Sequence, residues 1–491
     1  MKKNTSKARW ADWARALIYS GLYIWFLYWV DAWWGLIILP FILDAYITHF
    51  IPWTWWKKAE NPVVRTVMGW VDAIVFALVA VYFVNVYFFQ NYVIPSSSLE
   101  KSLLVGDYLL VSKMSYGPRV PQTPLHMPLC QHTLPLNLGK SYIEWPQWEY
   151  KRVSPKPIKL NDIVVFNYPA GDTIITNPNY QTEYYSMVYG YGMSLAGNPG
   201  LDTLSVLKRR QYFEQVYNLG RQFVSDATFH RTVCQSTGIP YEDFGKVGYR
   251  PTDRRENYVK RCVGLPGQTL QIKDKVIYLD GKVNPDAENV QYKYHVDLKS
   301  NDLPADVCYD LGLSMDDVNE MYQKGEIPLT KAAKEALEKL TAYVNSVTPV
   351  EERETGFLYP QNGYTGWTCD NYGPIWIPKK GEKIKLTLEN LPIYERPIRT
   401  YEGNTLEVTS EGKILINGKE TDEYTFQMDY YWMQGDNRHC SADSRYWGFV
   451  PEDHIVGKPI VIWWSTDADR SWLSGHHVRW SRLFRFVDNI K

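Results

Sequence analysis

The chain has 491 residues, and single cores stop growing at roughly 250 to 300 residues, so we expect more than one structural unit. Its 53 basic and 54 acidic side chains give a formal net charge of −1. Because such a balance produces no strong global field, it argues against nucleic acid as a partner, and we expect none.

The N-terminal region has the composition of a membrane segment. Ten of the 20 tryptophans lie in the first 70 residues, and Trp concentrates where lipid meets water. Apolar stretches occupy residues 16–30, 32 to about 50 (with Asp44 inside) and 71–89. The third is close to the ~20 residues that span a bilayer as a helix, so we predict a transmembrane anchor. The first two predict a membrane hairpin, which we favour, or helices lying in the interface.

Charges between the apolar stretches predict the orientation of the chain. Lys and Arg precede the first and third stretches, whereas Asp31 separates the first from the second. Cytoplasmic loops are enriched in positive charge, so residues after Gln90 are expected outside the cytoplasm. All six cysteines lie there, where disulfides can persist, although spacing does not give their connectivity. The sequence has no CxxC and no HExxH, so we expect neither a metal site nor a cofactor.

The part after residue 92 has the pattern of an antiparallel β protein. Short runs rich in Val, Ile, Tyr and Phe alternate with turn residues. The strand candidates are residues 108–112, 162–167, 258–263, 269–273, 276–279 and 460–464. Two segments, starting at Gly267 and Gly403, each predict a hairpin that ends in an Asp-Gly or Asn-Gly turn. We therefore expect a mostly β fold.

Two long stretches interrupt this β pattern, and we interpret them as insertions into one β core. The second contains an apolar stripe at helical spacing, which predicts a helix packed on the domain. The stripe consists of Ala333, Ala336, Leu337, Leu340, Tyr343 and Val344. We divide the chain into a membrane hairpin with a cytoplasmic loop (1–66), an anchor helix (67–91), three core segments (92–170, 251–283 and 403–491) and the two insertions (171–250 and 284–402).

A dense cluster of hydroxyl groups follows the anchor. Residues 94–117 read IPSSSLEKSLLVGDYLLVSKMSYG, with three serines directly after Pro95. Serine triplets usually mark only a turn. A serine becomes a nucleophile when a base takes its proton, and lysine can do so where burial lowers its pKa from about 10.4. Lys260, in the apolar run NYVKRCVGLPGQTL, is such a candidate, or else an ordinary charge at a strand edge.

Together with NDIVVFNYP and MQGDNRHCSADSRYWGFVPEDHIVGK, these runs resemble the sequence boxes of the bacterial type I signal peptidases. Those enzymes are membrane-anchored Ser/Lys endopeptidases that remove signal peptides from exported preproteins. The resemblance covers residues 93–169, 257–282 and 424–457, about a third of the chain. It implies an antiparallel β-sheet catalytic domain of signal-peptidase type with large α/β insertions, preceded by N-terminal transmembrane helices.

The resemblance also implies roles for individual residues. Ser98 corresponds to the nucleophile and Lys260 to the general base, while Ser96 and the backbone N–H of Ser98 hold the oxyanion. Ser441 corresponds to the serine that orients the lysine ammonium. If the serine cluster is a strand, Ser96 and Ser98 face the same side and Ser97 points away. The residues interpreted as supports of the loop around Ser441 are Asp436, Arg438, Asp443 and Arg445.

The implied substrates carry small residues, usually Ala, one and three positions before the cut, because shallow pockets exclude larger side chains. The residues expected to line these pockets, or else to be ordinary core residues, are Ile94, Pro95, Leu99, Leu103, Tyr258 and Val259. The implied partners are signal-peptide-bearing preproteins and the lipid bilayer. The implied enzyme is a monomer in the bacterial cytoplasmic membrane, with its catalytic domain on the extracytoplasmic side.

The chain departs from the family pattern near the candidate site. Lys101 introduces a cation whose role the sequence does not assign, and His439 and Cys440 stand where Asp-Asn is common. His439 is a rival base, although the intact Lys260 segment favours the lysine. Two other functions stay open: another Ser/Lys processing peptidase, for pilins or conjugation systems, and a membrane-tethered binding protein with a vestigial site.

Overall fold

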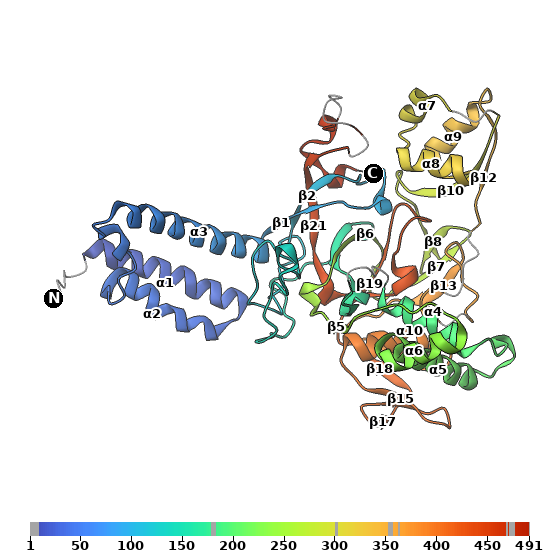
Figure 1. Cartoon of the computed structure of the whole chain (residues 1–491), viewed down its shortest axis with the longest axis horizontal. Helices are drawn as coiled ribbons and strands as arrows, with labels where there is room; N and C mark the ends of the chain where they lie inside the picture. Colours follow the sequence, from blue (N-terminus) through green and yellow to red (C-terminus); the bar gives the residue numbers. More distant parts are fainter. Residues whose placement is uncertain are drawn as a thin grey trace.

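The computed structural model describes residues 9–177, 183–299, 303–351, 357–361, 364–467, 470 and 477–490. The N-terminal helices project from the rest of the chain, with α1 (Trp10–Val30) beside α3 (Pro62–Tyr87) (Figure 1). Within the described part of the chain, α3 is the one helix long and apolar enough to cross a membrane. It begins after Asn61, whose side chain caps the helix by accepting a hydrogen bond from the N–H of Val63 at 2.9 Å.

The second apolar stretch folds back along α1 as short helical segments. These are a 3₁₀ helix at Trp33–Ile38, α2 at Leu39–Leu43 and a π-helical turn at Asp44–Thr48. Asp44 is buried, and its carboxylate accepts hydrogen bonds from the N–H groups of Phe50 (2.7 Å) and Ile51 (3.0 Å), which ends the run. The first two apolar stretches thus form a helical pair, and their place in a membrane stays a prediction.

A curled antiparallel sheet forms the centre of the chain (Figure 1). Its strand order is β1 (Phe89–Val93), β2 (Asp107–Ser112), β21 (Ile455–Ser465), β3 (Ile163–Asn167), β6 (Asn257–Gly264), β19 (Tyr430–Gln434) and β20 (Val450–Pro451), and β22 (Arg485–Phe486) pairs with β21. Four predicted strands fall in this sheet, as β2, β3, β6 and β21, so those predictions are confirmed.

The sheet is buried on both faces. Successive side chains of a strand alternate between the faces, and β3 shows the result. Val165 belongs to a core with Leu99 and Leu103 on one face, and Phe166 belongs to a core with Trp447 on the other. Each of these five side chains is 3% exposed or less. The central strands are therefore held from both sides.

Both predicted hairpins are confirmed, each as a three-stranded unit. The first consists of β7 (Thr269–Lys273), β8 (Val276–Leu279) and β9 (Lys282–Asn284), with β13 (Tyr372–Trp376) beside β7. The second consists of β15 (Leu406–Val408), β16 (Ile414–Ile416) and β17 (Lys419–Glu420). Asp280-Gly281 (φ 49° and 78°) and Asn417-Gly418 (φ 53° and 76°) make left-handed two-residue turns, which match the twist of the strands.

The first insertion is helical. It contains α4 (Tyr184–Ala196), α5 (Val206–Ser225) and α6 (Ala227–Thr237), and the strands β4 (Thr173–Ile175) and β5 (Val247–Tyr249) pair at its base. Two glycines let α4 and α5 pack closely. A Cβ at Gly192 would lie 2.1 Å from the carbonyl oxygen of Val216, and a Cβ at Gly220 would lie 1.9 Å from that of Val188.

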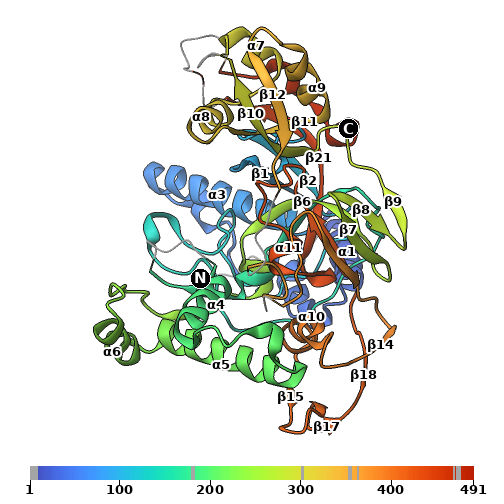
Figure 2. The same cartoon turned by 90° about the vertical axis from the view of Figure 1, so that its right-hand side faces the viewer.

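The second insertion contains a separate α/β module. Strand β10 (Gln291–Leu298) lies between β11 (Glu326–Thr330) and β12 (Val344–Pro349), next to α7 (Ala305–Asp310), α8 (Met315–Lys324) and α9 (Lys331–Lys339). Figures 1 and 2 show this module and the helices α4 to α6 on opposite sides of the central sheet. Between the module and the second hairpin unit lie β14 (Lys383–Lys385) and α10 (Leu391–Arg396), and after that unit come β18 (Glu423–Thr425) and α11 (Ser444–Trp447).

The helix predicted from the apolar stripe is confirmed only over α9. Leu340 leaves the helix with φ −81° and ψ 56°, and Val344 begins β12. The prediction was wrong beyond Lys339 because a run rich in β-branched residues pairs with β10 instead. A mostly β chain is likewise not confirmed, since helical residues (38%) outnumber strand residues (24%). The β character holds for the central sheet, and the insertions and N-terminal region add the helices.

The glycine contact between α4 and α5 generates a test of the fold. Gly220→Ala is expected to destabilise the chain by about 1–3 kcal/mol, because the added methyl group would push the two helices apart. The control is Gly190→Ala on α4, where the new Cβ would meet nothing closer than 3.8 Å and Ala favours a helix, so stability should be unchanged or higher. Thermal unfolding of the full chain in detergent measures both, and equal Tm values would contradict the close packing.

Candidate active site

Ser98 lies on a short turn directly after the first strand of the sheet. Ser96 has extended backbone (φ −135°, ψ 156°), and Ser97–Leu99 forms one turn of 3₁₀ helix. Leu99 fixes the turn, because its side chain is 1% exposed and its carbonyl accepts a hydrogen bond from the N–H of Leu103 at 2.8 Å. The predicted strand alternation across the serines is therefore wrong. Ser98 is buried, whereas Ser96 and Ser97 are exposed.

Lys260 reaches Ser98 from the middle of the sheet. It lies on β6 between β3 and β19, and it is only 4% exposed. Its Nζ atom is 2.6 Å from the Oγ atom of Ser98, which is a short hydrogen bond. The structure thus brings together the two residues that the sequence predicts as nucleophile and base, although 162 positions separate them.

The environment of Lys260 favours the neutral amine. Burial lowers the pKa of Lys260 to about 8, because the charged form loses its hydration. The carboxylates of Asp443 and Asp436 act in the opposite direction, and the guanidinium of Arg445 lowers the pKa again. A large fraction of the amine is therefore neutral at weakly alkaline pH. A neutral amine can accept the hydroxyl proton of Ser98.

Asp436 ties the serine turn to the lysine strand. Its carboxylate accepts hydrogen bonds from Nε and Nη2 of Arg261 at 2.8 and 2.7 Å, and from Oγ of Ser102 at 2.6 Å. Arg261 directly follows Lys260 on β6, and Ser102 lies four residues after Ser98. Asp436 is 1% exposed and Arg261 is 7% exposed. Breaking a buried pair of this kind costs about 3–5 kcal/mol of folding stability. The carboxylate of Asp436 therefore holds the segment after Ser98 firmly against β6.

The loop of residues 435–443 also holds the backbone of the serine turn. The N–H of Asn437 donates to the carbonyl of Ser98 at 3.1 Å, and its side-chain amide donates to the carbonyl of Ser97 at 3.4 Å. Gly435 approaches the same turn, since a Cβ there would lie 2.6 Å from the carbonyl oxygen of Ser98. Only a residue without a side chain fits at this position.

Three of these supports were missed in the sequence: Arg261, Ser102 and Asn437. Arg261 carried a usable signal, because an arginine inside an apolar strand requires a buried acidic partner. The partner itself, Asp436, is 175 residues away, and nothing local indicates the pairing. Ser102 and Asn437 gave no comparable signal.

Asp443 and Arg445 form a second buried pair. Nε and Nη2 of Arg445 donate to the two carboxylate oxygens of Asp443 at 2.9 and 2.8 Å, and Nη2 also donates to the carbonyl of Arg438. The N–H of Gly435 donates to Asp443 at 3.2 Å. Burial raises the pKa of Asp443, but the charge and hydrogen bonds of Arg445 outweigh it and hold the pKa below its ordinary value. The charged pair therefore fixes the shape of the 435–443 loop.

Ser441 lies beside Gly435, where an added Cβ would be 2.2 Å from its Oγ atom. This Oγ atom is buried and makes no hydrogen bond to any residue that the structure describes. The expected contact with Lys260 is therefore not formed here. The role of Ser441 in orienting the lysine stays a prediction.

The side chain of His439 is bound to residues of the second insertion. Its Nε2 atom lies 2.7 Å from a carboxylate oxygen of Asp370, and its Nδ1 atom accepts a hydrogen bond from the backbone N–H of Lys293 at 3.2 Å. Both ring nitrogens are thus engaged, and the side chain is fully buried. This geometry removes the argument for His439 as the base that serves Ser98.

Arg438 and Lys101 contact the same insertion. Arg438 donates to the carboxylate of Asp286 at 2.6 Å and to the hydroxyl of Tyr292 at 3.0 Å. Lys101 donates to the carbonyl of Gly312, just after α7. The cation that the sequence left unassigned therefore connects the serine turn to the inserted module.

The residues expected to line the substrate pockets fall into two groups. Ile94 (4% exposed), Leu99 (1%) and Leu103 (0%) are deep in the core on one face of the sheet. The other three, Pro95, Tyr258 and Val259, are exposed or partly exposed. The first group can form the floor of a pocket and the second its accessible wall. Among the described residues, no group of three His, Cys, Asp or Glu side chains is placed to hold a metal ion.

Comparison with known proteins identifies the family. The profile of the family "Signal peptidase, peptidase S26" matches residues 67–201, 227–334 and 380–464, which is more than half of the chain. Signal peptidase I of Buchnera aphidicola (subsp. Acyrthosiphon pisum, strain APS) is 24% identical over 238 residues, covering 47% of this chain and 57% of that protein.

Two further relatives match over shorter segments. Signal peptidase I of Haemophilus influenzae is 35% identical over 103 residues, covering 17% of this chain and 29% of that protein. Signal peptidase I of Leptolyngbya laminosa is 39% identical over 75 residues, covering 13% of this chain and 36% of that protein. The chain thus spans less than two thirds of the length of each of these relatives. By the extent of the family match, the chain belongs to the signal peptidases of the peptidase S26 family.

Proposed function

We propose that the chain is a membrane-bound serine endopeptidase that cleaves signal peptides from exported preproteins, with Ser98 as nucleophile and Lys260 as general base. The observation that carries the proposal is the 2.6 Å contact between Lys260 Nζ and Ser98 Oγ, in a site where burial lowers the pKa of the lysine to about 8. The names of the relatives, signal peptidase I, support the substrate class.

The mechanism follows from these two groups. Neutral Lys260 takes the hydroxyl proton as Ser98 Oγ attacks the carbonyl carbon of the scissile peptide bond. The tetrahedral intermediate then collapses, the lysine ammonium gives its proton to the leaving amine, and an acyl-enzyme ester remains on Ser98. Lys260, neutral again, takes a proton from the water that attacks the ester carbonyl. The second tetrahedral intermediate then collapses: Oγ of Ser98 leaves and regains its proton from the lysine ammonium, and the signal peptide is released with a free carboxylate.

The oxyanion binds at the serine turn. The first N–H groups of a helical turn have no partner within the turn, so the N–H of Ser98 can donate to the oxyanion. Ser96, the residue just before the turn, is exposed and has extended backbone. Its hydroxyl is the second donor in this proposal. A single donor of this kind contributes about 10²–10³ in rate in other enzymes. Hydrogen bonds from Asn437 to the turn keep these donors in place.

The site lies close to the proposed membrane anchor. Helix α3 ends at Tyr87, and Ser98 comes eleven positions later (98 − 87), after the 5 residues of β1 that begin at Phe89. In this proposal α3 crosses the bacterial cytoplasmic membrane and the catalytic domain lies on the extracytoplasmic side. The enzyme is a monomer, and its partners are the lipid bilayer and the preproteins. The division into core segments and insertions given above belongs to the same proposal. A cleavage site that emerges from the bilayer would then meet Ser98 directly.

The assignment of the dyad generates the first functional test. Ser98→Ala and Lys260→Ala are expected to lower kcat on a preprotein with an Ala-X-Ala site by at least about 10³-fold, because each removes a group of the reaction. Mass spectrometry of the products maps the cut in detergent-solubilised full-length enzyme.

His439→Asn is the comparison variant, since the imidazole is bound to Asp370 and Lys293. It should cut at the same bond as wild type. Cleavage by Lys260→Ala, or loss of all cleavage in His439→Asn with the fold intact, would favour the histidine as base. If wild type leaves a panel of preproteins uncut but processes pilin-type substrates, the result favours another Ser/Lys peptidase. If wild type cuts no substrate at all, the result favours a binding protein.

The lowered pKa of Lys260 predicts a pH dependence of catalysis. The active form is the neutral amine, so kcat/KM is expected to rise about tenfold per pH unit below the pKa of about 8 and to level off above it. The measurement is kcat/KM from pH 6 to 10 on one preprotein, with circular dichroism at each pH to show that the fold persists. A flat profile over this range would refute Lys260 as the base.

A further inference from the structure

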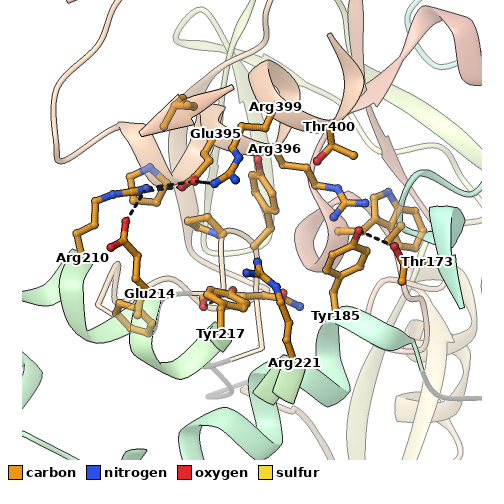
Figure 3. A pocket seen from close by; sticks show the side chains of 18 of the residues that line it. Thr173, Tyr185, Arg210, Glu214, Tyr217, Arg221, Glu395, Arg396, Arg399 and Thr400 are labelled. Atoms are coloured by element: carbon orange, nitrogen blue, oxygen red, sulfur yellow. Dashed lines mark hydrogen bonds and ion pairs between the residues drawn. The ribbon is translucent and has the colours of Figure 1, made fainter. Parts of the chain in front are cut away.

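Ion pairs join the two walls of a cavity between α5 and α10 (Figure 3). Arg210 on α5 pairs with Glu214 at 3.2 Å and with Glu395 on α10 at 2.8 Å. Arg399 is a second partner of Glu395, at 3.0 Å. These charges are paired within the chain and hold the first insertion against the core. A second cavity has a different character, because it is apolar and lies beside the proposed membrane anchor.

The apolar cavity has a volume of about 680 Å³, which is within the range of ligand sites in proteins. One wall comes from α1, the 3₁₀ helix at Trp33–Ile38 and the last turns of α3. The other wall comes from residues 124–148, in the segment between β2 and β3. The helix wall includes Phe26, Leu27 and Phe83, and the opposite wall includes Met127, Leu134 and Trp148.

The wall opposite the helices is part of a long irregular hairpin. Isolated β-bridges pair Arg119 with Arg152, His126 with Tyr142, and Thr133 with Lys140. We call residues 119–152 the loop hairpin. Four of its apolar side chains are 75–91% exposed: Leu129, Leu136, Leu138 and Trp145. An exposed apolar set of this kind marks a contact with a membrane or a protein, and tryptophan favours the boundary between membrane and water.

The loop hairpin is fixed against the side of the anchor helix. The hydroxyl of Tyr82 on α3 donates to the carbonyl of Pro124 at 2.7 Å, and the ring of Trp148 lies 4.9 Å from that of Trp34. Helix α3 has 26 residues and is about 39 Å long, which exceeds about 30 Å of hydrocarbon by roughly 9 Å. Tyr82 is five positions (87 − 82), or about 7.5 Å, before the end of α3. With α3 centred across the membrane, the hairpin therefore meets α3 just inside the hydrocarbon boundary.

Two tyrosine hydroxyls on the helix wall are bonded within the chain. Tyr23 and Tyr82 donate to the backbone carbonyls of Gly35 and Pro124, both at 2.7 Å. The side chains around them are mostly aliphatic and aromatic. A ligand therefore gains little from hydrogen bonds here, and an apolar chain fits the cavity best.

Size distinguishes the two apolar chains that can reach this depth, a lipid acyl chain and the apolar segment of a signal peptide. Such a segment has about 7 to 15 residues, and a ten-residue helix, about 15 Å long and 10 Å across, fills about 1,200 Å³. The cavity holds about 680 Å³. An acyl chain is a single file of methylene groups without hydrogen-bonding groups, so it fits where such a helix does not.

We infer that this cavity binds an acyl chain of a phospholipid from the extracytoplasmic leaflet, with the loop hairpin inserted at the surface of that leaflet. The hairpin follows β2, which pairs with β1 beside the turn of Ser98, so this contact sets the height of Ser98 above the bilayer. The inference goes beyond the proposed peptidase activity and rests on the proposed membrane position of α3.

Photo-cross-linking with a lipid tests the inference. The full chain is reconstituted in vesicles of phosphatidylethanolamine and phosphatidylglycerol, which include a phosphatidylethanolamine with a diazirine in the middle of one acyl chain. After irradiation, mass spectrometry maps the labelled residues. Labels are expected at Met127, Leu134 or Trp148, which line the cavity. A label is also expected at Phe76 on α3, which is 76% exposed and serves as the internal reference.

Filling the cavity should remove the label from the hairpin. Leu134→Trp adds volume inside the cavity, so the ratio of hairpin label to Phe76 label is expected to fall at least about threefold. Met127→Trp is a second filling variant. Leu129→Trp is the matched control and should keep the ratio of wild type, since Leu129 lies on the same hairpin, is 78% exposed and does not line the cavity. Thermal unfolding shows which variants are folded.

A hairpin without label beside a labelled Phe76, or a hairpin label that survives both filling variants, would overturn the inference. A preprotein with a diazirine-bearing leucine in its apolar segment tests the other occupant. If that segment cross-links to the hairpin and displaces the lipid label, the cavity belongs to the signal peptide and the inference fails.

The labelling experiment separates this inference from the proposed function, because it needs no cleavage. A chain that cuts no preprotein but gives the expected labels refutes the peptidase activity and supports the lipid site. Loss of the label at Phe76 as well as on the hairpin would contradict the membrane position of α3, and the inference with it.

Discussion

The burial of the Lys260 amine is the constraint on which the site depends. The proposed catalysis needs a neutral amine, and burial away from water favours that form by lowering the pKa of Lys260. The loops that create this environment are held by two carboxylates, Asp436 and Asp443, whose charge raises the pKa of the same lysine. Each carboxylate is paired with a buried arginine, Arg261 or Arg445. Pairing holds the carboxylates in place as hydrogen-bond acceptors. The charge of Arg445 also acts against the rise that the two carboxylates cause in the pKa of Lys260.

The second insertion uses the same loop as its point of attachment. The N–H of Gln291 donates to the carbonyl of Asp436 at 2.8 Å, and the N–H of Arg438 donates back to Gln291 at 2.9 Å. His439 adds the bonds to Asp370 and Lys293 described above. Lys101 and His439, two of the residues in which this chain departs from the family pattern, thus contact the inserted module. Their changes are explained by a structural role, because a loop that carries an extra module needs partners for it.

The sequence predicted what depends on local pattern. All six strands, both hairpins and the approach of Lys260 to Ser98 followed from periodicity, turn residues and the family boxes. Prediction from the sequence failed where contacts between distant residues determine the local conformation. The turn at Ser97–Leu99 is set by burial of Leu99 rather than by strand propensity, and α9 ends at Lys339 because β10 offers a partner to the next residues. The hydrogen bond that Arg261 donates to Asp436 joins strand β6 to the 435–443 loop, which no local signal relates.

The pockets predicted for the residues before the cut draw on both faces of β6, since Val259 packs on one face and Tyr258 on the other. On the face of Leu99 and Leu103 the core is closely packed, and a closely packed core cannot expand to admit a large side chain. Selection there is restricted to size, which suits a requirement for small residues before the cut. On the other face, Tyr258 is partly exposed beside the buried Trp447, so the predicted pockets keep one accessible wall while Lys260, two residues further along β6, stays 4% exposed.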